Sequence, residues 1–279
     1  PRLPRPPAPR AAPRPAPKAA AGLVADARSR CQAWVPGLAP DEAVEWSGPC
    51  RNGLAHGMGE LLRRQGEAVV SVTQGRFAEG RAEGPATVAL AGGGFLEAEF
   101  SAGQASAGSI RYGDASLYQG ELRDLLPDGQ GSRSWPRGAR YDGQWVAGQR
   151  SGEGRQQDAA GVYEGQWRHD RRHGEGVQTY PGGDRYEGAW RDDQRSGRGT
   201  MQWSGGVYEG EWRHDRRNGT GSETYRSGSR YLGQFVDDLP SGAGTLVAPG
   251  GRPQPGQVAG GCFIAGGRSQ RILPGPGAC

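Results

Sequence analysis

The chain has 279 residues, of which 51 are glycine and 21 are proline. This composition is typical of low-complexity chains and argues against an ordinary aliphatic core. The formal net charge is +4, but residues 1–30 carry seven basic groups against one acidic group, and the rest carries 27 against 29. The body therefore has no large basic field, and we expect no nucleic-acid partner.

Apolar stretches in the sequence are short. None approaches the roughly 18 residues that a membrane-crossing helix needs, so the sequence predicts no membrane-spanning segment. Any contact with a membrane is therefore expected to be peripheral.

Residues 1–30 open with PRLPRPPAPRAAPRPAPKAA, which predicts a disordered linker rich in proline, alanine and arginine. Such a segment is extended, partly polyproline II, and acts as a semi-rigid spacer. Its basic groups suit an anionic surface at about 1 kcal/mol each. We favour the spacer because no aromatic or amphipathic stripe is present. The chain starts at Pro1 without an initiator methionine, which leaves open a removed signal peptide or anchor upstream.

The four cysteines bracket the middle of the chain: Cys31, Cys50, Cys262 and Cys279. None belongs to a Cys-x-x-Cys motif, so we expect no zinc site. A Cys31–Cys50 disulfide is favoured, in a capping segment at 31–45 and the unit after it. Such a bridge would lock a frayed end in an oxidising compartment. Pairing of Cys262 with Cys279 stays open.

A repeat dominates the centre of the sequence. Clear copies begin at Tyr118, Tyr141, Tyr163, Tyr186, Tyr208 and Tyr231, at alternating intervals of 23 and 22 residues. Weaker copies begin at Trp46, Thr73 and Leu96, which gives nine repeats over 46–253. Residues 254–279 are interpreted as a degenerate tenth repeat or C-terminal cap. The 45-residue superperiod follows from alternating connectors such as PGGDR and SGGV.

Each repeat is predicted to be a β-hairpin. In YEGQW, Tyr163, Gly165 and Trp167 share one face of a strand at a period of two. RHDRRH is a polar reversal, and GEGVQTY supplies a second strand with Gly174 and Gly176 on one face. Two strands and two turns use all 22 or 23 residues, so no helix fits.

Large rings and glycines recur in fixed register. Glycine weakens a strand unless a bulky group must lie against the backbone there. We infer that rings of one hairpin cover the glycines of a neighbouring hairpin, which is a known way to hold register. Each ring buries on the order of 150 to 250 Å², so two rings per unit replace an aliphatic core.

YEGQWRHDRRHGEGVQTYPGGDR resembles a repeat of the membrane occupation and recognition nexus (MORN) family. The resemblance is strongest over 118–244, and the prefix AVEWSGPCRNGLAHGMG is similar to exported bacterial members. It implies an all-β fold: an elongated single-layer antiparallel sheet of stacked β-hairpins with no closed barrel. It also implies a scaffold that dimerises, holds a partner's segment in a groove, or organises proteins at membranes.

Eight rings are candidate site residues. They have two interpretations, as the stacking core and as the lining of a partner-binding groove, because Tyr and Trp are also frequent hot-spot residues. In a single-layer sheet one ring can do both. The eight are Tyr141, Trp145, Tyr163, Trp167, Tyr186, Trp190, Tyr208 and Trp212.

No motif in the sequence indicates catalysis. His169 and His173 lie in or beside a hairpin turn, so their spacing does not indicate a metal pair, and we expect no metal or cofactor. The RHDRR runs are interpreted as soluble turn tips, with phosphate binding as the weaker alternative. No Gly-x-x-x-x-Gly-Lys segment or Gly-x-Ser-x-Gly elbow is present. We therefore expect a protein that is not an enzyme.

The leading hypothesis is a non-catalytic scaffold that binds another protein or a second copy of itself. The alternative is peripheral binding to membrane lipid headgroups or an envelope polysaccharide, since stacked aromatic residues suit sugar rings. The expected location is periplasmic or extracellular, with a membrane tether upstream of residue 1 allowed. The cytoplasmic face of a membrane is the alternative location.

Overall fold

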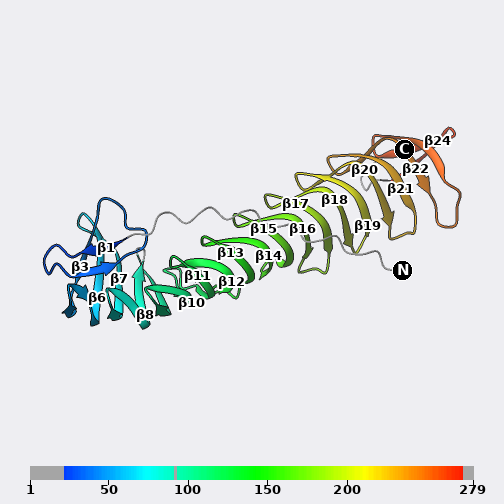
Figure 1. Cartoon of the computed structure of the whole chain (residues 1–279). Coiled ribbons are helices and arrows are strands. Elements are labelled where there is room, and N and C mark those ends of the chain that lie inside the picture. Colours follow the sequence, from blue (N-terminus) through cyan, green and yellow to red (C-terminus); the bar gives the residue numbers. More distant parts are fainter. Residues whose placement is uncertain (1–21, 91–92, 273–279) are drawn as a thin grey trace, which may run out of the picture. The chain divides into compact units, whose positions relative to one another are not determined.

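The computed structural model describes residues 22–90 and 93–272, and every regular element in these ranges is a β-strand (Figure 1). They fall into two compact units, unit 1 (Pro1–Ala91 with Glu99–Gln104) and unit 2 (Gly92–Ala98 with Ala105–Cys279). We describe each unit by itself.

The strands up to the first gap are β1 (Leu23–Ala25), β2 (Gln32–Trp34), β3 (Glu42–Trp46), β4 (Cys50–Arg51), β5 (Leu54–Ala55), β6 (Gly57–Gln65), β7 (Ala68–Ala78) and β8 (Arg81–Leu90). After the gap come β9 (Gly94–Ser101), β10 (Gln104–Arg111), β11 (Leu117–Arg123), β12 (Leu126–Ser134), β13 (Arg140–Val146), β14 (Gln149–Asp158), β15 (Gly161–Arg168), β16 (Arg171–Thr179) and β17 (Arg185–Arg191). The last strands are β18 (Gln194–Trp203), β19 (Gly206–Arg213), β20 (Arg216–Tyr225), β21 (Arg230–Val236), β22 (Leu239–Val247), β23 (Gln254–Ala259), β24 (Cys262–Ala265) and β25 (Arg268–Arg271).

Unit 1 begins with a small four-stranded sheet in the order β1-β2-β5-β4. β1 and β2 pair antiparallel, so Leu23–Ala25 is an ordered strand. The disordered linker predicted for residues 1–30 is therefore wrong for this part, and residues 1–21 lie outside the described residues. The rest of unit 1 is an antiparallel meander of β3, β6, β7 and β8. Trp46 ends β3, and its ring lies against Gly59 and Phe77.

Unit 2 is an antiparallel meander in which each strand from β11 to β24 pairs with the strand before it and the strand after it. Figure 1 shows the hairpins of β11 to β22 lying one beside the next. The prediction of an all-β, single-layer antiparallel sheet of stacked hairpins with no closed barrel is confirmed. Residues 254–272 extend the sheet, and the end of the predicted tenth repeat, with Cys279, lies outside the described residues.

Each repeat hairpin reverses through two residues in the left-handed conformation. His169 and Asp170 have φ of 49° and 66°, which is the pattern of a type I′ turn. Such a turn matches the right-handed twist of the flanking strands and favours short polar side chains. The polar reversal predicted at RHDRRH is therefore a two-residue turn between β15 and β16.

A bulge follows each turn in the second strand. Gly165 pairs with Gly176 and Trp167 pairs with Arg172, so three residues of β16 stand opposite one residue of β15. Gly174, inside the bulge, has φ of +64°, a conformation that glycine adopts without strain. The prediction that Gly174 and Gly176 share one face of a regular strand is wrong, because the bulge separates them.

The aromatic rings and the glycines meet as one packed layer. The Tyr163 ring lies on Gly176 of its own hairpin, and its hydroxyl donates to the Gln166 carbonyl at 3.0 Å. The Trp167 indole donates across to the Gly154 carbonyl of the preceding hairpin at 3.3 Å. Rings therefore cover glycines as expected, but the covering tyrosine belongs to the same hairpin and the tryptophan bonds the neighbour.

Successive rings also touch one another edge to face. Centroids lie 4.9–6.5 Å apart along an unbroken series from Tyr118 to Phe263. T-shaped pairs of this kind add about 0.5–1.5 kcal/mol each beyond their buried area. This series is the core of unit 2, and it links every hairpin to the next.

Gly176→Ala tests the contact between ring and glycine. The added methyl would fall on the Tyr163 ring, so we expect the free energy of unfolding to drop by about 1–3 kcal/mol, as overpacking does. Gly182→Ala is the matched control, because nothing lies within 4 Å of its added carbon. Urea unfolding followed by tryptophan fluorescence measures both. Equal losses in the two variants would contradict the packing described here.

Candidate functional site

The eight candidate rings all lie in the core. Their exposed fractions run from 0% to 5%, so a partner cannot stack on their faces without opening the sheet. Burial raises the pKa of Tyr208 to about 12, which keeps its hydroxyl neutral as the donor to the Glu211 carbonyl. A role for these rings in partner binding remains a prediction. Contact with a partner is expected only at the ring edges that line hollows.

Arginine side chains cover the rings on their outer side. The Arg150 guanidinium lies 4.3 Å from the centroid of the Trp167 ring. Arg172 lies in the same way over Trp190, at 4.2 Å. Such cation–π contacts contribute roughly 0.5–2 kcal/mol, depending on burial. The ring face of the sheet is therefore a surface of arginines supported by tryptophans.

The same arginines fasten each hairpin to the turn of the next. Arg150 donates from its backbone N–H, its Nε and its NH2 group to Asp170, at 3.1, 3.0 and 2.8 Å. Asp170 returns its own backbone N–H to the Arg150 carbonyl at 3.1 Å. The arrangement recurs in three further pairs, Arg172 with Asp193, Arg195 with Asp215, and Arg217 with Asp238.

These Arg–Asp clamps correct the interpretation of the RHDRR runs as soluble turn tips. Asp170 and Arg172 each bond a neighbouring hairpin, and the exposed Arg168 also pairs with Asp192 of the next hairpin. Arg171 of the same run is exposed. The signal was present in the sequence as an arginine and an aspartate 20 or 21 residues apart. The arginine and the aspartate of a clamp belong to different repeats. Their contact can therefore be recognised only once the register between hairpins is known.

Two hollows open on the ring face, one superperiod apart. The first, of about 200 Å³, is polar and includes Gln156, Asp158 and Gln178 in its lining. The second, of about 360 Å³, has Met201, Trp203 and Glu223 at the equivalent positions. The edges of Tyr163 and Trp167 line the first hollow, and those of Tyr208 and Trp212 line the second. The repeat geometry is the same, and only the lining differs.

The histidines do not form a metal pair in the described residues. His173 Nδ1 lies 3.8 Å from Asp192 Oδ1, and burial together with Arg168 lowers the pKa of His173, so it is neutral at pH 7. His169 lies in the turn itself. No group of three His, Cys, Asp or Glu side chains is close enough to hold a metal ion within residues 22–90 and 93–272.

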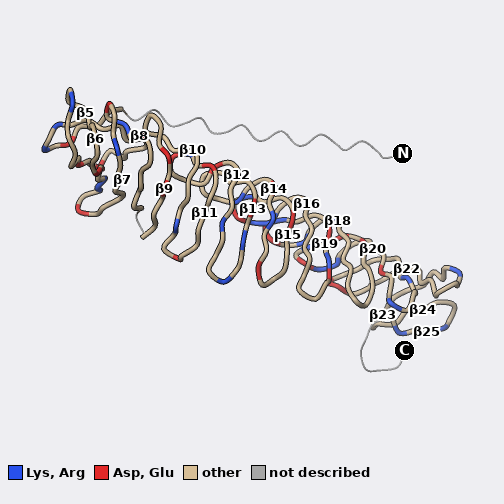
Figure 2. The backbone as a smooth tube through the Cα atoms, turned by 90° about the horizontal axis from the view of Figure 1, so that it is seen from below, with Lys and Arg blue, Asp and Glu red and all other residues tan. Residues whose placement is uncertain are grey.

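Figure 2 shows basic and acidic residues interspersed along the hairpins of unit 2.

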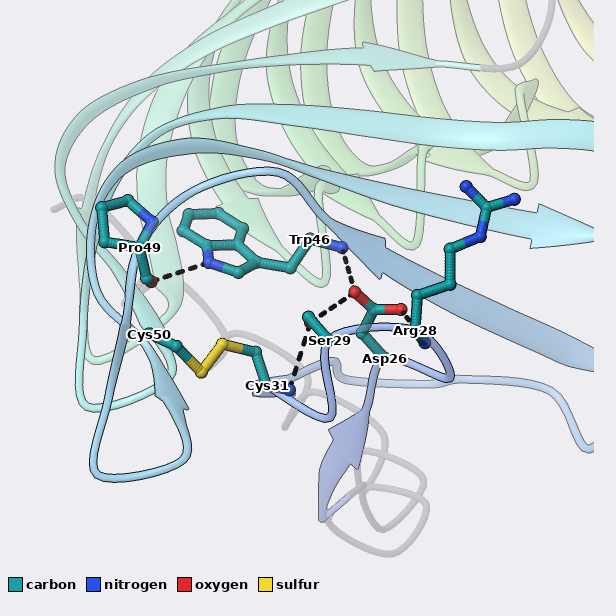
Figure 3. Close-up of a disulfide and its surroundings, with 7 residues drawn as sticks. All are labelled: Asp26, Arg28, Ser29, Cys31, Trp46, Pro49 and Cys50. Carbon is teal, nitrogen blue, oxygen red and sulfur yellow. Dashed lines mark hydrogen bonds between the residues drawn. A yellow bond between two sulfur atoms is a disulfide. The ribbon is translucent and has the colours of Figure 1, made fainter.

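The cysteine site lies in unit 1. Cys31 and Cys50 form a disulfide with Cα atoms 5.9 Å apart (Figure 3). Beside it, the buried Asp26 carboxylate accepts backbone N–H groups of Arg28 and Trp46 at 2.9 and 3.3 Å. Burial alone would raise the pKa of Asp26, but these bonds and the Ser29 hydroxyl hold the pKa below its usual value. Cys279 lies outside the described residues, so its pairing with Cys262 stays open.

No helix in the described ranges is long and apolar enough to cross a membrane.

Arg172→Ala tests the clamp. It removes the guanidinium bonds to Asp193, and we expect a loss of about 1–3 kcal/mol in the free energy of unfolding, with the low end favoured by the exposure of Asp193. Arg171→Ala is the matched control. Arg171 is exposed and bonds nothing beyond the sheet among the described residues, so its loss should stay within about 0.5 kcal/mol. Equal thermal midpoints for the two variants would show that the clamp contributes nothing.

Two solved structures similar to this chain are a mutant of the TCP10 domain of Danio rerio CPAP and the SAS-4 (dCPAP) TCP domain of Drosophila melanogaster with a proline-rich motif of Ana2. Their sequence identities are 10% and 8%, and their TM-scores are 0.29 and 0.28. The matches cover 79% and 64% of this chain, and 97% and 87% of those chains. No curated protein matches.

The MORN repeat family model matches six segments of the chain. They are residues 118–140, 141–161, 163–185, 186–207, 208–230 and 231–251. These segments begin at or beside the six tyrosines that open the clear copies, and each contains one hairpin of unit 2. Residues 118–251 of the chain are therefore six MORN repeats.

Proposed function

We propose that the protein is a non-catalytic scaffold whose repeat sheet binds another polypeptide. MORN repeats over 118–251 support an interaction module in general terms. The observation that carries the proposal is the single layer: each strand from β11 to β22 makes its main contacts with its neighbours in the sheet. The rings that would otherwise need a second layer are covered by arginines, so both faces are left for partners.

Variation within the superperiod supports selective binding. Gln156 and Met201 occupy equivalent places 45 residues apart, as do Asp158 and Trp203. A change that keeps the hairpin intact but converts a polar hollow into an apolar one alters what the hollow accepts. The apolar hollow at Met201 and Trp203 therefore suits an apolar side chain of the partner.

A double substitution tests this function. Met201→Gln with Trp203→Asp gives the apolar hollow two polar residues of its sibling, so the sheet should fold unchanged. We expect the wild-type chain to bind a second copy or a purified partner protein, and the variant to bind roughly tenfold more weakly, a difference of about 1.4 kcal/mol. Sedimentation equilibrium measures self-association, and calorimetry measures binding of a partner identified by crosslinking.

Two outcomes would contradict the scaffold. One is that the protein is strictly monomeric and binds none of the purified candidate partner proteins. The other is that anionic vesicles bind the protein, both with and without residues 1–30, while no partner protein binds it. That result would favour the alternative function, peripheral binding to lipid headgroups.

We also propose that the protein works in an oxidising compartment, which is periplasmic or extracellular. The disulfide between Cys31 and Cys50 supports this location, because such bridges persist where thiols are not kept reduced. Thiol alkylation of freshly prepared cell fractions, followed by mass spectrometry, tests it. We expect Cys31 and Cys50 to resist alkylation until a reductant is added. Alkylation of both residues before reduction would place the protein in a reducing compartment.

A further inference from the structure

A third hollow, of about 790 Å³, lies between the hairpin of β17 and β18 and the hairpin of β19 and β20. Its lining includes Ser196, Gly197, Arg198 and Asn218. Gly197 is the bulge glycine of its repeat, with φ of +69°. The hollow therefore opens at a position where the six clear repeats carry a bulge.

Four sibling repeats fill this position with a long side chain from the first strand, at Gly129, Gly152, Gly174 and Gly219. In the repeat of Gly242 nothing lies within 4 Å of the added carbon. A carbon added at Gly174 would fall on the Gln166 side-chain oxygen, and one at Gly152 on that of Gln144. At Gly219 the Glu211 carboxylate lies in the same place. These three glycines are half-buried as a result.

The repeat of β17 and β18 has Ala189 in place of the glutamine or glutamate. Its side chain ends at Cβ, which is the only atom within 4 Å of a carbon added at Gly197. Gly197 is consequently exposed, unlike its counterparts. Gly197, which the missing side chain leaves uncovered, forms part of the lining of the hollow.

The missing side chain also removes a hydrogen-bond acceptor. Gln144 Oε1 accepts the backbone N–H of Glu153 at 3.1 Å, and Gln166 Oε1 accepts that of Glu175 at 3.3 Å. The equivalent N–H belongs to Arg198, and no side chain of the described residues accepts it. The hollow thus presents a backbone donor where two sibling repeats place a side-chain oxygen.

The charges around the hollow favour an anion. Arg191, Arg198 and Arg213 line it, and none of them forms an ion pair in the described part of the chain. Of the two acidic residues in the lining, Asp192 lies 3.5 Å from Arg168 and Glu211 lies over Gly219. Guanidinium groups bind carboxylates through paired hydrogen bonds, more strongly than they bind neutral amides.

We propose that this hollow binds a glutamate side chain of a partner polypeptide, which takes the place of the missing glutamine. The inference rests on the proposed scaffold function and specifies the chemistry of one contact. Length follows from the siblings, because a glutamine or glutamate side chain reaches the bulge glycine. The negative charge follows from Arg198, which stands where two siblings have Glu153 and Glu175.

Ala189→Gln is the direct test, because it supplies the side chain that the siblings use and should leave the fold intact. The probe is a capped peptide, acetyl-Gly-Ser-Glu-Glu-Ser-Gly-amide, titrated at low salt while the Arg Nε–H and Arg198 amide signals are followed by NMR. We expect shifts of these signals in the wild type, with binding weakened roughly tenfold or more in Ala189→Gln. The peptide with glutamine in place of glutamate should bind more weakly.

Gln166→Ala is the matched control for an empty bulge. It opens the same space beside Glu175 instead of an arginine, so we expect no binding of the glutamate peptide there. Circular dichroism and thermal midpoints confirm that each variant is folded.

Equal binding by wild type and Ala189→Gln would overturn the proposal, as would no binding at millimolar peptide. Inorganic phosphate is titrated in parallel. If phosphate binds and the glutamate peptide does not, the hollow is a phosphate site and the proposal is wrong. The scaffold function fails separately, since it is tested through Met201 and Trp203 in a different hollow.

Discussion

A tyrosine ring lying on a bare glycine is the contact on which unit 2 depends. Gly176 shows its full use: the Tyr163 ring covers it, and its carbonyl accepts the Trp190 indole N–H of the next hairpin. One glycine thus joins two hairpins, and a side chain there would push the Tyr163 ring away. Repetition of this contact gives a chain poor in aliphatic residues a continuous core within one layer.

The Arg–Asp clamps act on the same joints from the outside. Arg172 lies over the Trp190 ring and bonds the turn at Asp193, so one side chain shields the core and fixes the spacing of hairpins. Because geometry is set by these recurring residues, the remaining positions are free to vary. Ala189 and Met201 show the result. Ala189 leaves Gly197 uncovered in the lining of one hollow, and Met201 together with Trp203 makes another hollow apolar, while the hairpins are kept.

Much of this architecture follows from the sequence. Alternation in YEGQW and the intervals of 22 and 23 residues predict the hairpins and their order, since both are local properties of the chain. The bulge at Gly174 and the Arg150–Asp170 clamp could not be predicted, because they depend on the pairing between strands and between repeats. The gap at Ala189 was missed for a related reason. An alanine at this position is significant only by comparison with the glutamine or glutamate that other repeats have there.

Hydrogen exchange of the indole N–H groups tests the central claim most directly. Trp145, Trp167, Trp190 and Trp212 each donate to a glycine carbonyl of the preceding hairpin, at 3.0–3.3 Å. Trp203, the last residue of β18, makes no such bond among the described residues. The four indoles should exchange only when the sheet opens, at rates close to those of the central strand amides, and Trp203 should exchange much faster. Exchange of Trp167 as fast as that of Trp203 would contradict the account.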